Sequence, residues 1–355
     1  MGLFSKISKS ARAQSTASQG DWREHISPLE AKLQLITGKG GVGRTTVSIA
    51  LATAYAAQGI KTLVLEVRDA ESELNDDAEG GGRDDSMLAR ALSQDGFSHL
   101  RELGKAPCKD DASISLGANP RLFSDSLWAA QLVAPVGHAA FLRSIIPSDR
   151  LVRAALDSVA LSKFLRSAPS MHELGLFYHL KSLADDPRFE RIVIDMPATG
   201  HALALAQLPE RIARIIKKGQ IVEGLRAGVR HISDPRQSSL WVVSLPETLP
   251  LTEANEMSLA LKKDGLKVAG IICNRNASYE LTSDERFILD QLTRLDSDRL
   301  TWCVERINGA TISSQDECLL ESFDLHLCLP ELAHAQSRAQ YIAEEWFSYK
   351  NRGSK

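Results

Sequence analysis

Short apolar runs alternate along the chain with longer runs of helical spacing. Runs with the length and the β-branched or leucine-rich composition of buried strands stand at 33–37, 61–67, 191–195, 240–245, 268–273 and 325–329. Helical spacing follows at 46–58, from Ala202, at 251–263 and in the C-terminal segment to about Tyr349. Strands that alternate with helices build parallel sheets, so the pattern predicts an α/β fold with a doubly wound, mostly parallel sheet.

The segment between the second and third strand runs, about 87–188, shows little strand character. Val152, Leu156, Val159 and Lys163 have helical spacing, which favours a helical subdomain of about 87–188 inserted into a single domain of residues 29–350. Several apolar residues of this segment either pack its own core or line a groove for a client. They are Leu127, Trp128, Leu132, Val133, Phe141, Leu142, Ile145 and Ile146.

The N-terminal segment, residues 1–28, is rich in Ser, Ala, Lys and Arg and lacks the apolar core of a signal peptide. Leu3, Phe4 and Ile7, interleaved with basic residues, fit a short amphipathic helix on a membrane surface. The other interpretation is a disordered tail. Both remain open at the level of the sequence.

Charge, cysteine content and hydropathy restrict the expected partners and cellular location of the protein. A net charge of −3 gives no case for a nucleic-acid partner, which would require a clustered basic face. The five cysteines form no Cys-x-x-Cys pair, and their odd number favours a reducing compartment. No apolar run of about 18 residues is present. We therefore expect a cytoplasmic protein, either free or peripheral to a membrane.

The candidate chemistry begins in a glycine-rich turn between the first strand and the first helix. Residues 38–45 read Gly-Lys-Gly-Gly-Val-Gly-Arg-Thr, which fits the spacing of the phosphate-binding P-loop with Gly38, Gly43 and Thr45 in place. Backbone N–H groups of such a turn and the helix N-terminus converge on a phosphate. Arg44 stands where this motif normally has lysine, and Lys39 adds a second basic residue.

A carboxylate ends the third strand run, at Asp195. Magnesium takes hard oxygen ligands, and a P-loop hydroxyl with a strand-end Asp is the usual protein contribution. Thr45 and Asp195 are therefore the candidate metal residues for a bound Mg²⁺ ion and ATP.

Three further segments give the motif a family resemblance. Gly38 to Gly43, with the early Lys39, resembles the deviant Walker A of the MinD/ParA and arsenical-pump ATPase class. The run Asp-Met-Pro-Ala-Thr-Gly-His at 195–201 resembles the switch II of the arsenical-pump ATPase (ArsA) and tail-anchored-protein targeting family. Residues 69–76 resemble its switch I, and Pro246, Glu247, Glu253 and Asn274 resemble later elements. The similarity extends over about 32–349.

The resemblance implies a P-loop ATPase that works as a dimer. It implies that Lys39 reaches the partner's phosphates, that Asp69 activates the attacking water and that Asn274 contacts adenine. Gly200 and His201 would couple the γ-phosphate to movement of the helical insertion, although His201 also fits an ordinary helix N-terminal residue. Glu66 and Glu71 compete with Asp69 for the role of base. The residues implied to hold the nucleotide are Gly38, Gly40, Gly41, Val42, Gly43, Arg44, Thr45, Thr46 and Asn274.

Arg44 is the main departure from the family pattern. A planar guanidinium replaces a compact ammonium, so nucleotide binding can persist while hydrolysis is weakened by misplaced phosphates. The zinc-binding Cys-x-x-Cys of some targeting dimers and a clustered arsenite site are not evident.

Three functions remain consistent with these residues. The first is an ArsA-like ATPase that couples ATP to dimer rearrangement and handling of a client, in membrane-protein targeting or anion transport. The second is a degenerate nucleotide-binding subunit that pairs with an active paralogue. The third is a MinD/ParA-like positioning ATPase. A homodimer or a heterodimer, and a hydrophobic client or membrane-associated partner, are the expected partners.

Overall fold

The structure is a computed structural model of the 355-residue chain. It describes residues 28–68, 86–93, 116–167, 170–197, 234, 236–264, 266, 268–276, 323, 326–330 and 335–347. The predictions for Asp69, Glu71, Gly200, His201, the N-terminal tail and the helix from Ala202 lie outside these residues.

In the described part of the chain, eight strands form one sheet in the order β3-β4-β2-β5-β1-β6-β7-β8. Every neighbouring pair is parallel except β3 with β4, which is antiparallel. The mostly parallel α/β sheet expected from the sequence is thereby confirmed. The strands are β1 (Leu33–Gly38), β2 (Thr62–Val67), β3 (Arg121–Ser124), β4 (Leu127–Leu132), β5 (Arg191–Asp195), β6 (Ser238–Ser244), β7 (Val268–Asn276) and β8 (His326–Pro330).

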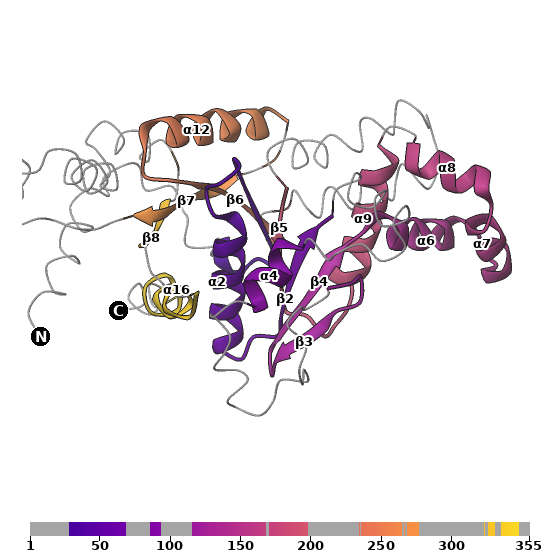
Figure 1. Cartoon of the computed structure of the whole chain (residues 1–355), viewed down its shortest axis with the longest axis horizontal. Helices are drawn as coiled ribbons and strands as arrows, with labels where there is room; N and C mark the ends of the chain where they lie inside the picture. The colour runs from indigo at the N-terminus through magenta and orange to yellow at the C-terminus, as the bar shows by residue number, and fades with distance from the viewer. Residues whose placement is uncertain are drawn as a thin grey trace, which may run out of the picture.

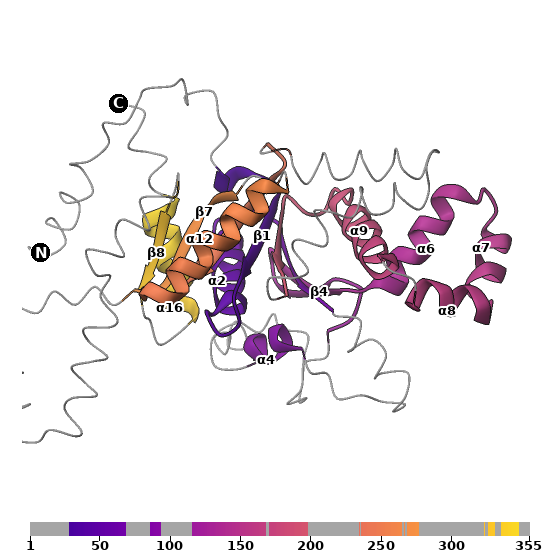
Figure 2. The same cartoon turned by 90° about the horizontal axis from the view of Figure 1, so that it is seen from above.

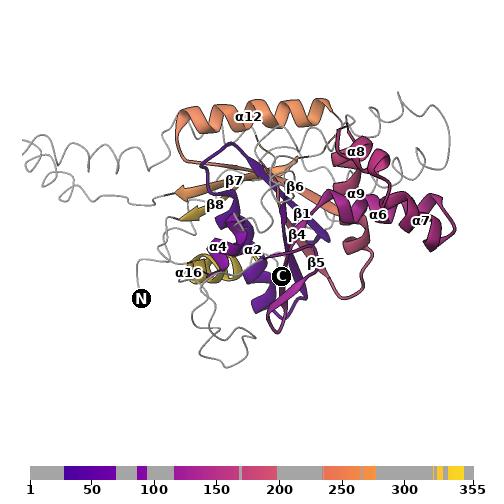
Figure 3. The same cartoon turned by 45° about the vertical axis from the view of Figure 1, so that its right-hand side comes forward.

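Helices lie on both faces of this sheet (Figure 1, Figure 3). On one face α12 packs with β6 and β7, and on the other face α2 and α16 pack against each other and the sheet. The described helices are α2 (Arg44–Ala57), α4 (Met87–Ser93), α6 (Ala134–Ile145), α7 (Asp149–Leu156), α8 (Val159–Ser167), α9 (Met171–Ala184), α12 (Thr248–Lys263) and α16 (Ala335–Tyr341), with a 3₁₀ turn η2 (Pro28–Glu30) and a π-helical turn η3 (Ile342–Trp346). Each of these helices is too short or too polar to cross a bilayer.

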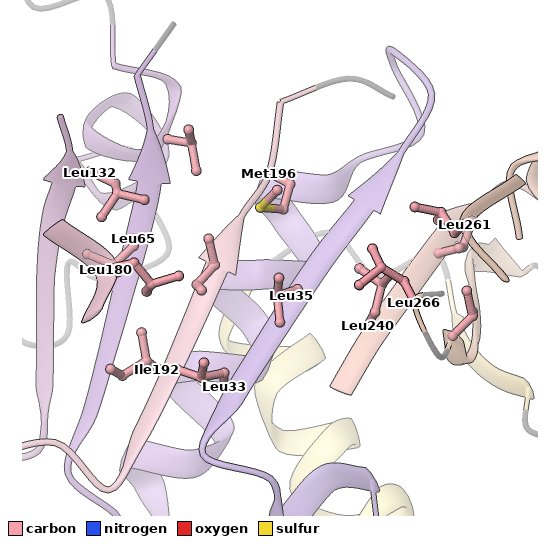
Figure 4. Packing of buried hydrophobic residues seen from close by; sticks show 14 of the residues in the cluster. Leu33, Leu35, Leu65, Leu132, Leu180, Ile192, Met196, Leu240, Leu261 and Leu266 are labelled. Atoms are coloured by element: carbon pink, nitrogen blue, oxygen red, sulfur yellow. The ribbon is translucent and has the colours of Figure 1, made fainter. Parts of the chain in front are cut away.

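Two apolar layers fix the central strands. Leu33 and Leu35 point into the layer shared with α9 and α12, as does Ile192 of β5 (Figure 4). Ile36 and Val193 point into the opposite layer, beneath α2. Because both faces are covered, the strands are continuous apolar runs rather than alternating ones, which is why they are recognisable in the sequence.

The expectation that 87–188 has little strand character is wrong. The segment contains β3 and β4, and β4 pairs in parallel with β2 along its whole length. The sequence of β4, Leu-Trp-Ala-Ala-Gln-Leu, contains no β-branched residue and reads as helix. Its pairing with β2 and its burial override that local preference. Among the described residues of this segment, the short helix α4 precedes β3 and β4, and the helices α6 to α9 follow them from Ala134.

Helices α6 to α9 project to one side of the sheet (Figure 2). They have their own small core, which includes Phe141, Leu142 and Val152. The continuous helical spacing expected across 152–163 is broken at 157–158, so Val152 is buried while Val159 is 68% exposed. Eight apolar residues of this segment were expected either to pack in a core or to line a groove for a client. Of these, Leu127, Leu132, Phe141 and Leu142 are buried in cores, and Ile145 is exposed. Trp128 and Ile146 also pack against these cores, so core packing accounts for six of the eight residues.

Candidate functional site

The glycine-rich turn lies between β1 and α2, at the carboxyl edge of the sheet. Gly41 and Gly43 have φ angles of 82° and 87°, in the left-handed region that favours glycine. A Cβ on Gly38 would lie 2.6 Å from the carbonyl oxygen of Val243, and a Cβ on Gly43 would lie 2.3 Å from Nδ2 of Asn274. The turn therefore has the tight path that the glycine pattern predicts, and any larger residue at 38 or 43 would displace it.

Asn274 of the neighbouring part of the sheet, on β7, is hydrogen-bonded to this turn. Its Nδ2 donates a hydrogen bond of 2.9 Å to the carbonyl oxygen of Val42, and only 2% of the residue is exposed. Its Oδ1 is buried and has no hydrogen-bond partner among the described residues. The family resemblance implies that this asparagine contacts adenine. In the structure its amide nitrogen is committed to the loop, and the adenine contact remains a prediction.

Thr45 and Asp195 meet as the two motifs predict. The Thr45 hydroxyl donates to Oδ2 of Asp195 at 2.5 Å, and the Ser48 hydroxyl lies 3.4 Å from Oδ1. Asp195 ends β5 and Thr45 lies in the first turn of α2, so strand pairing of β5 with β1 brings together residues 150 positions apart. Ser48 was missed by the sequence reasoning. The available signal was its position one helical turn after Thr45, on the same face of α2.

Burial of the Asp195 carboxyl raises its pKa to about 6. The Thr45 hydrogen bond and the charge of Arg44 oppose this shift, and the nearby charge of Glu66 adds to it. Desolvation therefore dominates over the favourable partners. A hard cation at this position would supply the positive charge that the buried carboxylate lacks.

The side chain of Arg44 reaches the end of β5. One of its guanidinium nitrogens, Nη1, donates a short hydrogen bond to the carbonyl oxygen of Met196. Burial lowers the pKa of Arg44, and the charge of Asp195 opposes that shift. The side chain that replaces the motif lysine is thus bound to the backbone just after Asp195.

Glu66 lies opposite Asp195, in register on the neighbouring strand β2. Its carboxylate accepts hydrogen bonds from the Ser86 hydroxyl and from the backbone N–H groups of Met87 and Leu88, at 2.8 and 3.2 Å for the latter two. The competing candidate for the water-activating base is therefore engaged with the first turn of α4.

Lys39 extends from the turn toward α12. Its Nζ lies 3.4 Å from Oε1 of Glu253, and the two side chains are 45% and 36% exposed. A Cβ on Gly40 would have no neighbour within 4 Å in the described part of the chain, and Thr46 is half-buried at the start of α2. Lys39 is thus beside the turn but at the surface, where it is accessible from outside the domain.

These residues fit a nucleotide phosphate and a divalent cation. The turn presents left-handed glycines next to the start of α2, which is the geometry that aims N–H groups at an anion. The oxygens of Thr45 and Asp195 are hard donors of the kind that Mg²⁺ prefers. Gly38, Gly40, Gly41, Val42, Gly43, Arg44, Thr45 and Thr46 would surround the phosphates, with Thr45 and Asp195 holding the cation.

Comparison with known proteins agrees with this geometry. Residues 33–294 match the family described as the CobQ/CobB/MinD/ParA nucleotide binding domain. The chain is 26% identical over 285 residues to "ATPase BagA" of Mycobacterium tuberculosis, covering 76% of this chain and 72% of the relative. It is 22% identical over 303 residues to "ATPase GET3B" of Arabidopsis thaliana, covering 74% and 68%. It is 25% identical over 256 residues to the "Arsenical pump-driving ATPase" of Escherichia coli, covering 67% and 38%.

Proposed function

Because the chain belongs to the CobQ/CobB/MinD/ParA nucleotide-binding family and its relatives include GET3 and arsenical-pump ATPases, we propose that it is an ArsA-like, magnesium-dependent ATPase with slow turnover. The contact between Thr45 and Asp195 at 2.5 Å carries this proposal. This contact supports the proposal because the hydroxyl of Thr45 and the carboxylate of Asp195, the two candidate magnesium ligands, lie together beside the glycine turn.

The chain's own residues position the nucleotide. Backbone N–H groups of 40–45 and the N-terminus of α2 bind phosphate oxygens. The oxygens of Thr45 and Asp195 would hold Mg²⁺, and the bound ion would neutralise charge on the phosphates. Asn274 and the packing of Gly38 on Val243 keep the turn in the conformation that these contacts require.

Slow turnover follows from the position of Arg44. A P-loop lysine supplies a compact charge to the phosphates, whereas the guanidinium of Arg44 donates to Met196. Phosphoryl transfer depends on exact positioning of charge, so a displaced cation reduces the rate more than it reduces affinity. We expect tight binding of ATP together with weak hydrolysis.

The decisive experiment measures binding and hydrolysis in parallel on the full chain. Isothermal titration with ATP, in the presence and absence of Mg²⁺, should show magnesium-dependent binding, and phosphate release should be slow but measurable. Thr45→Ala should weaken the magnesium dependence, and Thr252→Ala, on the exposed surface of α12, serves as the matched control. Equal binding by the Thr45→Ala variant and the unmodified chain would contradict the proposed cation site.

The family resemblance extends the proposal to assembly. Lys39 is exposed enough to reach a second subunit, and dimerisation would let it contact that subunit's phosphates. Movement of α6 to α9 would then act on a client, either a hydrophobic protein segment or a membrane-associated partner. Cross-linking with and without ATP, followed by mass spectrometry of the captured partners, tests both statements.

A second function is favoured by Arg44 itself. A chain that binds ATP but does not hydrolyse it would act as a nucleotide-holding subunit of a heterodimer. In that case hydrolysis would appear only after mixing with a paralogue that has an intact P-loop lysine. Full activity of the isolated homodimer would exclude this alternative.

A further inference from the structure

Two cysteines lie directly opposite each other on neighbouring strands at the edge of the described sheet. The strands β7 and β8 lie side by side (Figure 2), and Cys273 of β7 and Cys328 of β8 are partners in their parallel register. Both side chains pack against the same apolar layer, the one beneath α12, and both are thiols. Adjacent Ile272 and Leu329 point into the opposite layer, so the two sulfurs emerge on one face of the sheet.

The spacing of the two strands suits a disulfide. Neighbouring strands are about 4.8 Å apart, and disulfides join Cα atoms that are roughly 4.4–6.8 Å apart. The bond also requires about 3.8 Å between the Cβ atoms, which is about 1 Å less than the spacing of the strands that carry them. Forming it would therefore draw β7 and β8 together at this point, and such strained bonds are readily reduced again.

The next residue along β7 connects this pair to the nucleotide site. Asn274 directly follows Cys273 and holds the carbonyl oxygen of Val42 in the glycine turn at 2.9 Å. The nitrogen of the same amide group also packs closely on Gly43, since it would lie 2.3 Å from a Cβ built on that residue. With so little room, a shift of β7 at Cys273 must be transmitted to the Val42–Gly43 peptide through Asn274.

We propose that Cys273 and Cys328 form a reversible disulfide that lowers nucleotide affinity by displacing Asn274 from the glycine turn. This inference concerns regulation of the site and rests on the proposed function for its effect on nucleotide. The disulfide itself is independent of that function and can be detected without any nucleotide.

The oxidant that we name is a low-molecular-weight disulfide of the glutathione type. Cys273 is fully buried and Cys328 is partly exposed, so Cys328 reacts first. Its thiolate attacks one sulfur of the oxidant, which releases one thiolate and leaves a mixed disulfide. The Cys273 thiolate then attacks the Cys328 sulfur and releases the second thiolate. Two protein thiols have become one disulfide, the oxidant has become two thiols, and the two protons pass to the released thiolates.

The first measurement is chemical. The full chain is incubated with glutathione disulfide, alkylated, digested without reductant and analysed by mass spectrometry. We expect a linked peptide pair that contains Cys273 and Cys328 and that disappears with dithiothreitol. A variant in which Cys108, Cys303 and Cys318 are replaced by Ser should give the same linked pair. Absence of the pair, or linkage of either cysteine only to one of the other three, would overturn the proposal.

The second measurement is the response of nucleotide binding. Affinity for a fluorescent ATP analogue is compared between the reduced and oxidised forms of the same variant. We expect the oxidised form to bind about five- to tenfold more weakly, on the scale of one lost buried hydrogen bond, and to recover after reduction. A linked pair with unchanged affinity would overturn the regulatory role. Failure of the reduced chain to bind the analogue would instead count against the proposed nucleotide function.

Matched variants separate the disulfide from general damage by the oxidant. Cys328→Ala and Cys273→Ala should each bind nucleotide as the reduced chain does and should not respond to glutathione disulfide. Asn274→Ala, with the cysteine pair intact, should already bind more weakly and should lose little more on oxidation. An unaltered oxidation response in Asn274→Ala would exclude transmission through Asn274.

Discussion

The guanidinium of Arg44 donates a hydrogen bond to the backbone carbonyl of Met196, at the end of the strand that carries Asp195. This contact joins the first residue of α2 to the segment that the family resemblance identifies as switch II. The residue that departs from the P-loop pattern thus connects the two motifs in the structure. Replacing Arg44 with lysine tests the role of this contact, because lysine lacks the planar guanidinium that makes it.

Arg44→Lys should raise ATP hydrolysis by at least about tenfold while nucleotide affinity changes little, since the compact ammonium suits the phosphates and phosphoryl transfer depends on positioning. Single-turnover phosphate release measures the rate, and titration measures the affinity. Arg143→Lys is the control, because Arg143 is exposed on α6 and its salt bridge with Asp149, at 3.8 Å, lies among exposed side chains. An unchanged hydrolysis rate in Arg44→Lys would mean that Arg44 does not limit turnover.

Stability without nucleotide should depend on pH through Asp195. Burial raises its pKa from 3.8 to about 6, so its favourable contribution to folding is fully present below about pH 4 and is lost as pH rises through 6. Relative to Asp195→Asn, the unmodified chain should lose roughly 2 kcal/mol between pH 4 and pH 7.5. Urea unfolding of both proteins at several pH values gives this difference. A constant difference across the range would show that the carboxyl is not desolvated.

Lys39 should matter for turnover and hardly at all for stability. Its ion pair with Glu253 spans 3.4 Å between half-exposed side chains, and such pairs contribute about 0–1 kcal/mol. Lys39→Ala should therefore unfold within a few degrees of the unmodified chain, but it should lose most ATP hydrolysis if the lysine contacts a partner subunit's phosphates. Lys262→Ala, at the exposed end of α12, is the control. Normal hydrolysis by Lys39→Ala would remove Lys39 from the catalytic residues.

Gly137→Ala should destabilise the helices that project from the sheet. A Cβ at this position in α6 would lie 1.6 Å from the carbonyl oxygen of Gly175 in α9, so the two helices must separate. Overpacking of this kind costs about 1–3 kcal/mol. Gly117→Ala is the control, because a Cβ there has no neighbour within 4 Å among the described residues. Urea unfolding measures the loss, and equal midpoints for the two variants would contradict the close helix crossing.

Local chemistry explains which parts of the site were predictable. Gly38, Gly43, Thr45 and Asp195 belong to short motifs whose spacing is typical of P-loop proteins, so their positions follow from the sequence. Ser48 follows only when α2 is known to place it on the same face as Thr45. The pairing of Arg44 with Met196 has no sequence signal, because the acceptor is a backbone carbonyl that any residue would provide.

The sequence by itself determined the class of fold and the identity of the phosphate-binding turn. Buried parallel strands are continuous apolar runs, and tight turns with positive φ angles favour glycine. Both features can therefore be recognised in a short stretch of sequence. Only the tertiary structure decided that β4 is a strand, that Asn274 supports the glycine turn and that Cys273 faces Cys328. Each of these depends on which strands become neighbours, and strand neighbours are selected by burial over the whole sheet rather than by local propensity.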